Sequence, residues 1–169
     1  MKLSDYRQEL DWHSYDRIVA VEMIEAVGRD QLSTFFRHLN RLLRPGGRLI
    51  LQAITCPDSR YPHYCRQKTD FIRKHIFPGG HLPSLSALKQ SLDSGMSLTR
   101  VNHIGRHYEP TLDVWCSEWV RQKRHIQREL GRSEEFHRKW EFYFTLCSAL
   151  FARGNIDTVQ AVVEKEGGY

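Results

Sequence analysis

The stretch Tyr15-Asp-Arg-Ile-Val-Ala-Val-Glu-Met-Ile-Glu25-Ala-Val-Gly28 decides the fold of this chain. Its β-branched run from Ile18 to Val21 predicts a short buried strand. Two carboxylates, Glu22 and Glu25, follow that strand directly. Because ligands of open α/β sheets bind outside the carboxyl ends of the strands, the stretch predicts a site where this strand ends.

The next residues predict a second strand beside the first. Apolar side chains recur at helical spacing over 29–43, which indicates a helix packed on a sheet. The turn Pro45-Gly-Gly47 ends that helix, and residues 48–54 indicate the second strand. Gln52 and Thr55 therefore place further polar groups at the same rim of a parallel sheet.

The rest of the chain is predicted to be mostly helical. We expect a strand over 97–105, a last strand over 157–163, and helices over 70–77, 84–92, 111–130 and 133–151. The sequence leaves the direction of the last strand open. The aromatic segment 56–83 is too long for an ordinary connection and predicts a lid-like insertion.

Composition places the chain among ordinary globular domains. Its 169 residues are 40% hydrophobic and 27% charged, which allows one domain with a real core. No run reaches the roughly 18 apolar residues of a membrane span, and the polar N-terminus predicts no signal peptide. Four scattered cysteines predict reduced thiols in a cytoplasmic protein. Cys56, His63 and Cys65 lack a fourth ligand at suitable spacing, so we expect no metal site.

The net charge of +5 favours an anionic partner. Much of the excess falls on one segment, which contains Arg121, Lys123, Arg124, Arg128, Arg132, Arg138 and Lys139. One interpretation is a solvated helix face. Another is contact with anionic lipid headgroups, at about 1 kcal/mol per basic residue. Nucleic acid is a third, but the sequence contains no recognised nucleic-acid module, so we expect no such partner.

Several strings of residues resemble one enzyme family. They are the opening stretch, Leu42-Leu-Arg-Pro-Gly-Gly47, Ile76-Phe-Pro-Gly-Gly-His-Leu-Pro-Ser84 and His107-Tyr-Glu-Pro-Thr-Leu-Asp-Val-Trp115. By these strings the chain resembles the C-terminal part of the cyclopropane-fatty-acyl-phospholipid synthase family, which includes the mycolic acid cyclopropane synthases. The resemblance implies an α/β fold, a partial Rossmann-like class I methyltransferase sheet from the fourth strand onward, with helical lid insertions.

The resemblance also implies a missing portion. Family members hold S-adenosylmethionine with a glycine-rich loop after their first strand and an acid after their second. The 11 glycines of this sequence form no GxGxG. We therefore expect residues 1–169 to be the C-terminal part of a methyltransferase domain, whose partner is an N-terminal half or a second copy of the chain.

The implied reaction transfers a methyl or methylene group from S-adenosylmethionine to the cis double bond of a phospholipid acyl chain. It takes place at the inner face of the cytoplasmic membrane, with a bicarbonate ion as the base. By position, Glu25 matches the family's carboxylate, Ile54 a main-chain ligand and Tyr108 a hydroxyl. Gln52 stands where the family often has histidine. Because an amide cannot hold a proton, plain methylation of the acyl chain stays open.

Four further residues match family positions. Cys147 matches a cysteine once taken for the nucleophile, and we include it among the catalytic candidates. Tyr6 and Arg7 match a string beside the adenine. Val21 lies where family members touch the cofactor through the main chain. The structural alternatives are inert core packing for Cys147, a frayed terminus for Tyr6 and Arg7, and strand core for Val21.

The three central candidates have structural alternatives too. Glu25 would satisfy backbone amides at a helix N-terminus. Gln52 would be a buried amide bonded to a loop, and Tyr108 would be core packing with a satisfied hydroxyl.

Two other functions also remain open. One is a non-catalytic remnant that binds lipid or a partner and exposes an unpaired sheet edge. The other is a methyltransferase for a small molecule, which the IFPGG and HYxxTL strings speak against.

Overall fold

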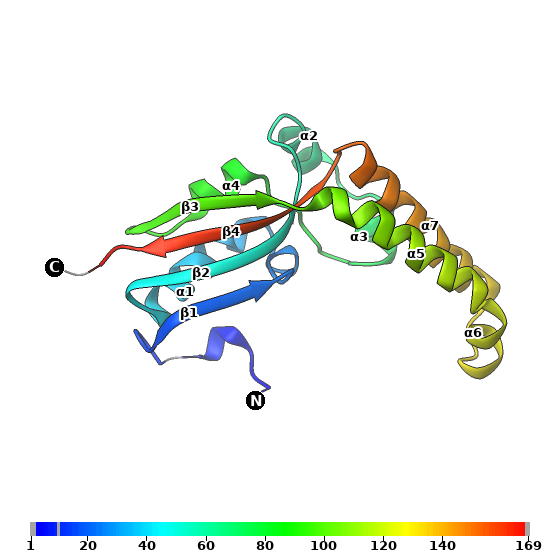
Figure 1. Ribbon diagram of the computed structural model, residues 1–169, viewed down its shortest axis with the longest axis horizontal. Helices are drawn as coiled ribbons and strands as arrows, with labels where there is room; N and C mark the ends of the chain where they lie inside the picture. Colours follow the sequence, from blue (N-terminus) through cyan, green and yellow to red (C-terminus); the bar gives the residue numbers. More distant parts are fainter. Residues whose placement is uncertain (1–2, 10, 168–169) are drawn as a thin grey trace.

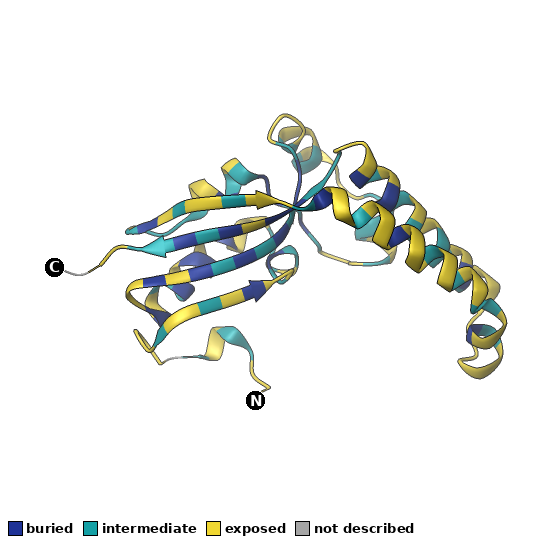
Figure 2. Ribbon diagram, viewed as in Figure 1, coloured by how far each residue is buried: buried dark blue, intermediate teal, exposed yellow. Residues whose placement is uncertain are grey.

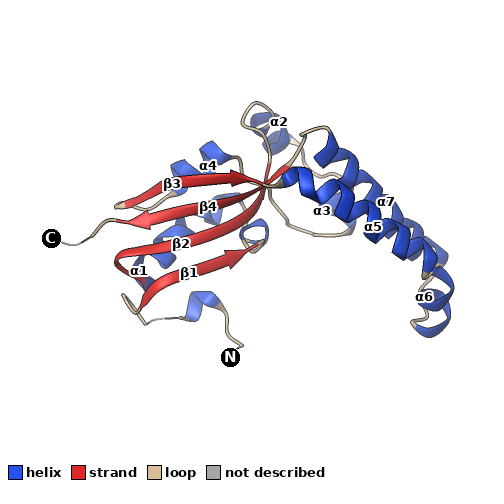
Figure 3. Cartoon of the chain, in the orientation of Figure 1, coloured by secondary structure: helices blue, strands red, loops and turns tan. Residues whose placement is uncertain are grey.

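The computed structural model describes residues 3–9 and 11–167 and is built on a four-stranded sheet (Figures 1 and 3). The strands are β1 (Tyr15–Val21), β2 (Leu43–Thr55), β3 (Met96–His103) and β4 (Asp157–Lys165), in the order β1-β2-β4-β3. β1 and β2 are parallel, whereas β4 is antiparallel to both β2 and β3. The direction that the sequence left open is therefore antiparallel, and β1 lies at an edge of the sheet.

One face of the sheet is covered and forms the main core. Helices α1 (Leu32–Leu42) and α4 (Leu85–Ser91) lie behind the sheet in the view of Figure 1. Phe35 and Phe36 of α1 pack with Leu49 and Leu51 of β2, and all four are at most 1% exposed. Each such side chain contributes about 1.5–3 kcal/mol by leaving water. This face supplies most of the chain's apolar burial.

The opposite face of the sheet is bare in the described part of the chain. Val19 and Val21 of β1 are 66% and 60% exposed, although the alternate residue Ala20 is 5% exposed. Figure 2 shows the resulting alternation of buried and exposed residues along the strands. Successive residues of a strand point to opposite faces, so the same strands present a dry side and a wet side.

A helical arm extends from the end of the sheet where β1, β2 and β3 finish and β4 begins (Figure 1). It contains the short η4 (Gly105–His107), then α5 (Tyr108–Arg121), α6 (Lys123–Glu129) and α7 (Glu134–Ala152). α5 packs on α7 through a cluster around Leu112, Cys147 and Phe151. We predicted one helix over 111–130, which is wrong, because Gln122 leaves helical geometry between α5 and α6. No glycine or proline marks this break in the sequence.

The remaining elements are short. They are η1 (Tyr6–Gln8), η2 (Ile24–Ala26), η3 (Arg29–Gln31), α2 (Tyr61–Arg66) and α3 (Phe71–His75). α3 lies within the predicted helix 70–77, whereas α2 was not predicted. β2 starts earlier than predicted, because the turn residues 44–47 belong to the strand. The lid role of segment 56–83 stays a prediction.

Candidate active site at the ends of β1 and β2

Glu22 is the first residue after β1 and the centre of a polar cluster. Its φ of 48° lies in the left-handed region, which is rare for a side chain of this kind and stores strain. Its backbone N–H donates to the Gln52 carbonyl at 2.8 Å, which holds the turn. Oε1 of Glu22 accepts a hydrogen bond from Nε2 of Gln52 at 3.0 Å and another from the Tyr108 hydroxyl. The strained turn therefore aims a carboxylate at the end of β2.

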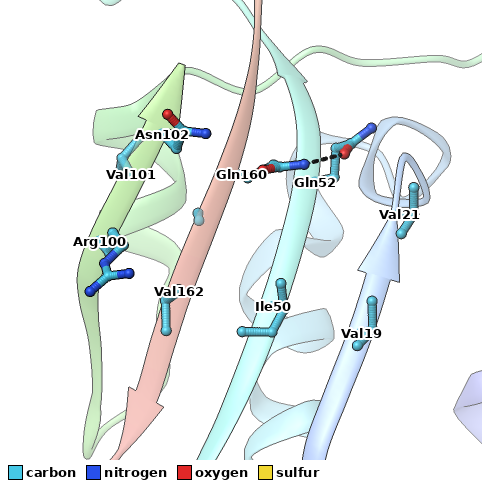
Figure 4. A pocket seen from close by; sticks show the side chains of 10 residues that line it. Val19, Val21, Ile50, Gln52, Arg100, Val101, Asn102, Gln160 and Val162 are labelled. Carbon is cyan, nitrogen blue, oxygen red and sulfur yellow. Dashed lines mark hydrogen bonds between the residues drawn. The ribbon is translucent and has the colours of Figure 1, made fainter. Parts of the chain in front are cut away.

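Gln52 is oriented by its neighbour across the sheet. Gln52 and Gln160 are register partners in the β2–β4 pair, and Nε2 of Gln160 donates to Oε1 of Gln52 at 3.1 Å (Figure 4). With that oxygen occupied, Nε2 of Gln52 faces Glu22 and also lies 3.1 Å from the Tyr108 hydroxyl oxygen. The network thus assigns the amide orientation.

Tyr108 enters the cluster from the first residue of α5. Burial and the hydrogen bond to Glu22 raise the pKa of Tyr108 to about 12. Its ring stacks on Phe151 of α7, with centroids 4.9 Å apart. The phenol therefore keeps its proton at neutral pH and acts as a hydrogen-bond donor to the Glu22 carboxylate.

Glu25 lies in η2 and faces the start of the irregular segment. Its Oε1 accepts the backbone N–H of Ile54 at 2.6 Å. Its Oε2 is buried and has no hydrogen-bond partner among the described residues. Burial raises the pKa of Glu25, and the nearby negative charge of Glu22 adds to the effect. Glu25 is thus held beside β2 rather than turned to bulk solvent.

The turn formed by the string Ile76-Phe-Pro-Gly-Gly80 holds the backbone of Glu25 through the residue that follows it. The backbone N–H of His81 donates to the Glu25 carbonyl at 2.9 Å. Gly79 has a φ of 81°, and a Cβ on Gly80 would lie 3.0 Å from the Phe77 carbonyl oxygen. Any other residue would strain the backbone at Gly79 and would crowd the Phe77 carbonyl at Gly80. The two glycines of this string therefore have a structural role next to the candidate site.

The remaining sequence candidates lie outside this polar cluster. Cys147 is 6% exposed beside Leu112 and Phe151, and burial raises the pKa of its thiol to about 11. It stays protonated at neutral pH, which favours the packing interpretation over a nucleophile. Tyr6 packs edge-on against Phe35 of α1, at 5.6 Å between ring centroids.

The two other cofactor candidates are more exposed. Arg7 forms an exposed ion pair with Asp5. Val21 adjoins Glu22 at the strand end and is exposed. Nothing in the structure tests a cofactor role for these two or for Tyr6, so that role stays a prediction.

A shallow hollow of about 660 Å³ covers the bare sheet face next to the cluster. Figure 4 shows Val21, Gln52 and Gln160 directed into it. The hollow is open to solvent on its outer side. Glu22 and Gln160 are themselves exposed in this chain.

The donors expected to hold a bicarbonate ion are already engaged. The Ile54 amide bonds Glu25, and both Gln52 and Tyr108 bond Glu22. A further anion here would meet two carboxylates and no free donor among these three groups. The geometry does not fit bicarbonate as an additional ligand, because Glu22 and Glu25 already accept the hydrogen bonds of these donors.

Three more observations describe the site and the chain. Among residues 3–9 and 11–167, no cluster of three or more His, Cys, Asp or Glu side chains is placed to hold a metal ion. Within the same residues, no helix is long and apolar enough to cross a membrane. All four cysteines are free thiols.

Sequence reasoning omitted Glu22 and Gln160 from the site residues. The signal for Glu22 was its place directly after the first strand. The signal for Gln160 was its alternation with buried Val159 and Ala161 on a strand that pairs with β2.

The sheet, with one antiparallel strand among parallel ones and a polar cluster at the strand ends, is part of a class I methyltransferase fold. The structure of cyclopropane synthase MmaA2 from Mycobacterium tuberculosis superposes with a TM-score of 0.84 at 29% identity, over 97% of this chain and 59% of that one. Mycolic acid cyclopropane synthase CmaA1, solved with SAH and CTAB, also gives 0.84 and 29%, with the same coverage. A putative sarcosine dimethylglycine methyltransferase from Galdieria sulphuraria, at 14% identity and a TM-score of 0.74, shows the same fold.

Sequence comparison defines the family. The family model "Mycolic acid cyclopropane synthetase" matches residues 1–161, so the chain belongs to this family of S-adenosylmethionine-dependent enzymes. Tuberculostearic acid methyltransferase UfaA1 of Mycobacterium tuberculosis is 38% identical over 167 residues, which are 98% of this chain and 38% of that protein. Cyclopropane-fatty-acyl-phospholipid synthase of Escherichia coli is 31% identical over 168 residues, 96% of this chain and 40% of that protein. The chain thus spans less than half of the length of these two relatives.

Proposed function

We propose that this chain carries the alkene-activating half of a lipid C-methyltransferase, in which Glu22 provides the anion beside the reacting carbons. The substrate class is the unsaturated acyl chain of a phospholipid. The observation that carries the proposal is the Glu22 carboxylate, held in a strained turn and bonded by Gln52 and Tyr108. Family membership supports the cofactor, S-adenosylmethionine, and the lipid class.

The reaction needs a negative charge placed before the chemistry starts. When bound, S-adenosylmethionine would supply the methyl group, with its S–C bond exchanged for a C–C bond to one alkene carbon. The other alkene carbon becomes cationic, and loss of one proton restores neutrality. Preorganised anions stabilise such a developing charge without reorganisation. In this proposal, Glu22 stabilises the cation and accepts the proton.

The other residues act on Glu22 or exclude water. Tyr108 and Gln52 fix the carboxylate, and Gln160 fixes Gln52. Gln52 cannot accept the proton, since an amide is not a base at neutral pH. Tyr108 remains a donor because its pKa is about 12. The proton therefore goes to a carboxylate, whichever carbon loses it.

A covering segment is required for this chemistry. Glu22 and the adjacent hollow are open to solvent in this chain, and water would quench a carbocation. The bare sheet face and the free edge of β1 are the surfaces where that segment would pack. If no such segment restores cofactor binding, the alternative function is a non-catalytic remnant that binds lipid or a partner, which the open hollow also allows.

The test uses a reconstituted protein. The chain is joined to the segment of UfaA1 that precedes its matched region, and S-adenosylmethionine binding is measured by calorimetry. With vesicles of unsaturated phospholipid, we expect Glu22→Gln to lower turnover by about 10²–10⁴-fold, the range for a positioned proton acceptor. The matched control is Glu164→Gln, a carboxylate of β4 that pairs with Arg48 at the other end of the strands.

A second variant separates Glu22 from bicarbonate. Glu22→Gly relieves the left-handed backbone strain and frees the Gln52 and Tyr108 donors. We expect the parent fusion to be indifferent to added bicarbonate and the glycine variant to be rescued by it. A parent that needs bicarbonate, together with a fully active Glu22→Gln, would remove Glu22 from the mechanism.

A further inference from the structure

The end of the helical arm combines positive charge with exposed apolar side chains. We define the arm end as residues 120–139, which comprise α6, the loop that follows it and the adjoining ends of α5 and α7. It holds seven basic residues and three acids, so it carries a net charge of +4 out of the chain's +5. Figure 1 shows α6 at the extremity of the arm, away from the sheet.

Part of this charge has no local counterion. Three of the basic residues are paired, in the contacts Arg121–Glu118, Lys123–Glu134 and Lys139–Glu135. The other members include Arg124, Arg128 and Arg138, which are exposed. Within the described ranges, no acid lies within ion-pair distance of these three arginines. The guanidinium groups of Arg124 and Arg128 are therefore available to an external anion, and Arg138 has only a longer-range attraction to Glu134.

Apolar groups are exposed among these charges. Leu130 is 60% exposed at the end of α6, next to Gly131, and Val120 is 45% exposed at the end of α5. Ile126, which lies between them in the sequence, is by contrast buried, at 6% exposed. Both side chains are therefore available to an external apolar partner.

A lipid surface satisfies both features at once. Anionic headgroups attract basic residues at a bilayer surface. Exposed apolar side chains leave water when they enter the boundary between the headgroups and the acyl chains. Nucleic acid would use the arginines but would leave Leu130 and Val120 in water. The exposed apolar pair therefore decides between the two partners.

We propose that the arm end is the docking surface for a bilayer that contains anionic phospholipids. Leu130 and Val120 enter the headgroup region, and Arg124, Arg128 and Arg138 contact lipid phosphates. The inference deepens the proposed function, on which it rests for the choice of a lipid surface. α5 runs from Tyr108 at the site to Arg121, about 20 Å at the usual helical rise, so docking would place the site at a defined height near the bilayer.

Binding can be measured without turnover, so the two proposals fail separately. The full chain is sedimented with phosphatidylcholine vesicles that contain 0, 20 or 40% phosphatidylglycerol. We expect binding to increase with phosphatidylglycerol and to weaken with salt. The triple variant Arg124→Gln, Arg128→Gln, Arg138→Gln should bind roughly 100-fold more weakly, since each phosphate contact is worth about fivefold.

The control removes the same charge elsewhere. Arg37→Gln, Lys68→Gln, Lys89→Gln changes three exposed basic residues of other surfaces, and we expect at most a few-fold loss. Leu130→Ser keeps the charge and should weaken binding several-fold with an unchanged salt dependence. All the replaced side chains are exposed, so circular dichroism should show an intact fold.

Three results would overturn the proposal. The first is equal weakening by the two triple variants. The second is binding to pure phosphatidylcholine that ignores the arginines, which would point to the bare sheet face. The third is loss of duplex DNA binding in the arm variant while vesicle binding is unchanged.

Discussion

The two faces of the sheet are made by the same strands but have different roles. On the face covered by α1 and α4, Leu49, Leu51 and Val159 are at most 1% exposed. On the other face, their neighbours Gln52 and Gln160 form a polar network and Val19 is mostly exposed. The difference shows that stability and chemistry are separated here by the two-residue period of a strand. A substitution should therefore affect one of them according to the face on which it lies.

The largest effect on stability should come from the covered face. Phe36 is fully buried between α1 and the sheet. We expect Phe36→Ala to lower the free energy of unfolding by about 3–5 kcal/mol, through lost burial and the cavity left behind. Urea denaturation followed by circular dichroism measures the change. A loss below about 1 kcal/mol would mean that this face is not the main core.

Gly105 tests the junction between the sheet and the arm. A Cβ at this residue would lie 2.9 Å from the backbone nitrogen of Thr158 and would also collide with the Asp157 carboxylate. We expect Gly105→Ala to cost about 1–3 kcal/mol by overpacking. The matched control is Gly154→Ala, where no atom lies within 4 Å but φ is 62°, so that only backbone strain is added. Thermal unfolding that ranks the control as the worse variant would contradict the packing at the junction.

Glu25, which lies beside the candidate site, should make the stability of the fold depend on pH. Burial raises the pKa of Glu25 above its ordinary value of 4.5, so the folded state holds this proton more tightly than the unfolded state. The stability that this difference provides is complete below the ordinary pKa and is lost as pH rises through the raised one. Glu25→Gln cannot ionise but keeps an oxygen for the Ile54 amide.

The measurement for Glu25 is the melting temperature from pH 4 to pH 8. We expect the variant and the parent to agree near pH 4 and the variant to become more stable as pH rises. A gain in stability confined to acidic pH would reverse the sign and refute the buried-carboxylate argument.

The smallest effect should come from the bare face. Val19 is 66% exposed, so replacing it with the equally shaped threonine removes little burial. We expect Val19→Thr to change the free energy of unfolding of the isolated chain by at most about 0.5 kcal/mol. In the reconstituted protein, the same change should cost more, because a covering segment would bury this position. Equal effects in both would mean that nothing packs on the bare face.

Much of the fold could be predicted from local pattern. The first strand, the helix over 133–151 and the last strand are confirmed, since each has strong periodicity or clear end signals. Ser133 shows why: its side chain caps the backbone N–H of Phe136, as serine at that position predicts. The break at Gln122 and the extension of β2 through Pro45 were missed. No glycine or proline marks the break, and the string Pro45-Gly-Gly47 has the pattern of a turn rather than of a strand.

The candidate site was predictable only in part. Glu25, Gln52 and Tyr108 were found by family strings, and the structure places Gln52 and Tyr108 together on Glu22. Which donor bonds which carboxylate depends on residues far apart in the chain, such as Tyr108 with Glu22. No spacing in the sequence encodes the left-handed turn at Glu22 that brings them together.

By itself, the sequence determined the family, the strand and helix types, and the residues that carry charge, because these follow from local periodicity and from strings of neighbouring residues. Only the tertiary structure decided that β4 is antiparallel, that one sheet face is bare and that Glu22 takes the donors expected for an external anion. Those outcomes depend on register and on contacts between distant residues, which the chain makes only once its sheet is assembled.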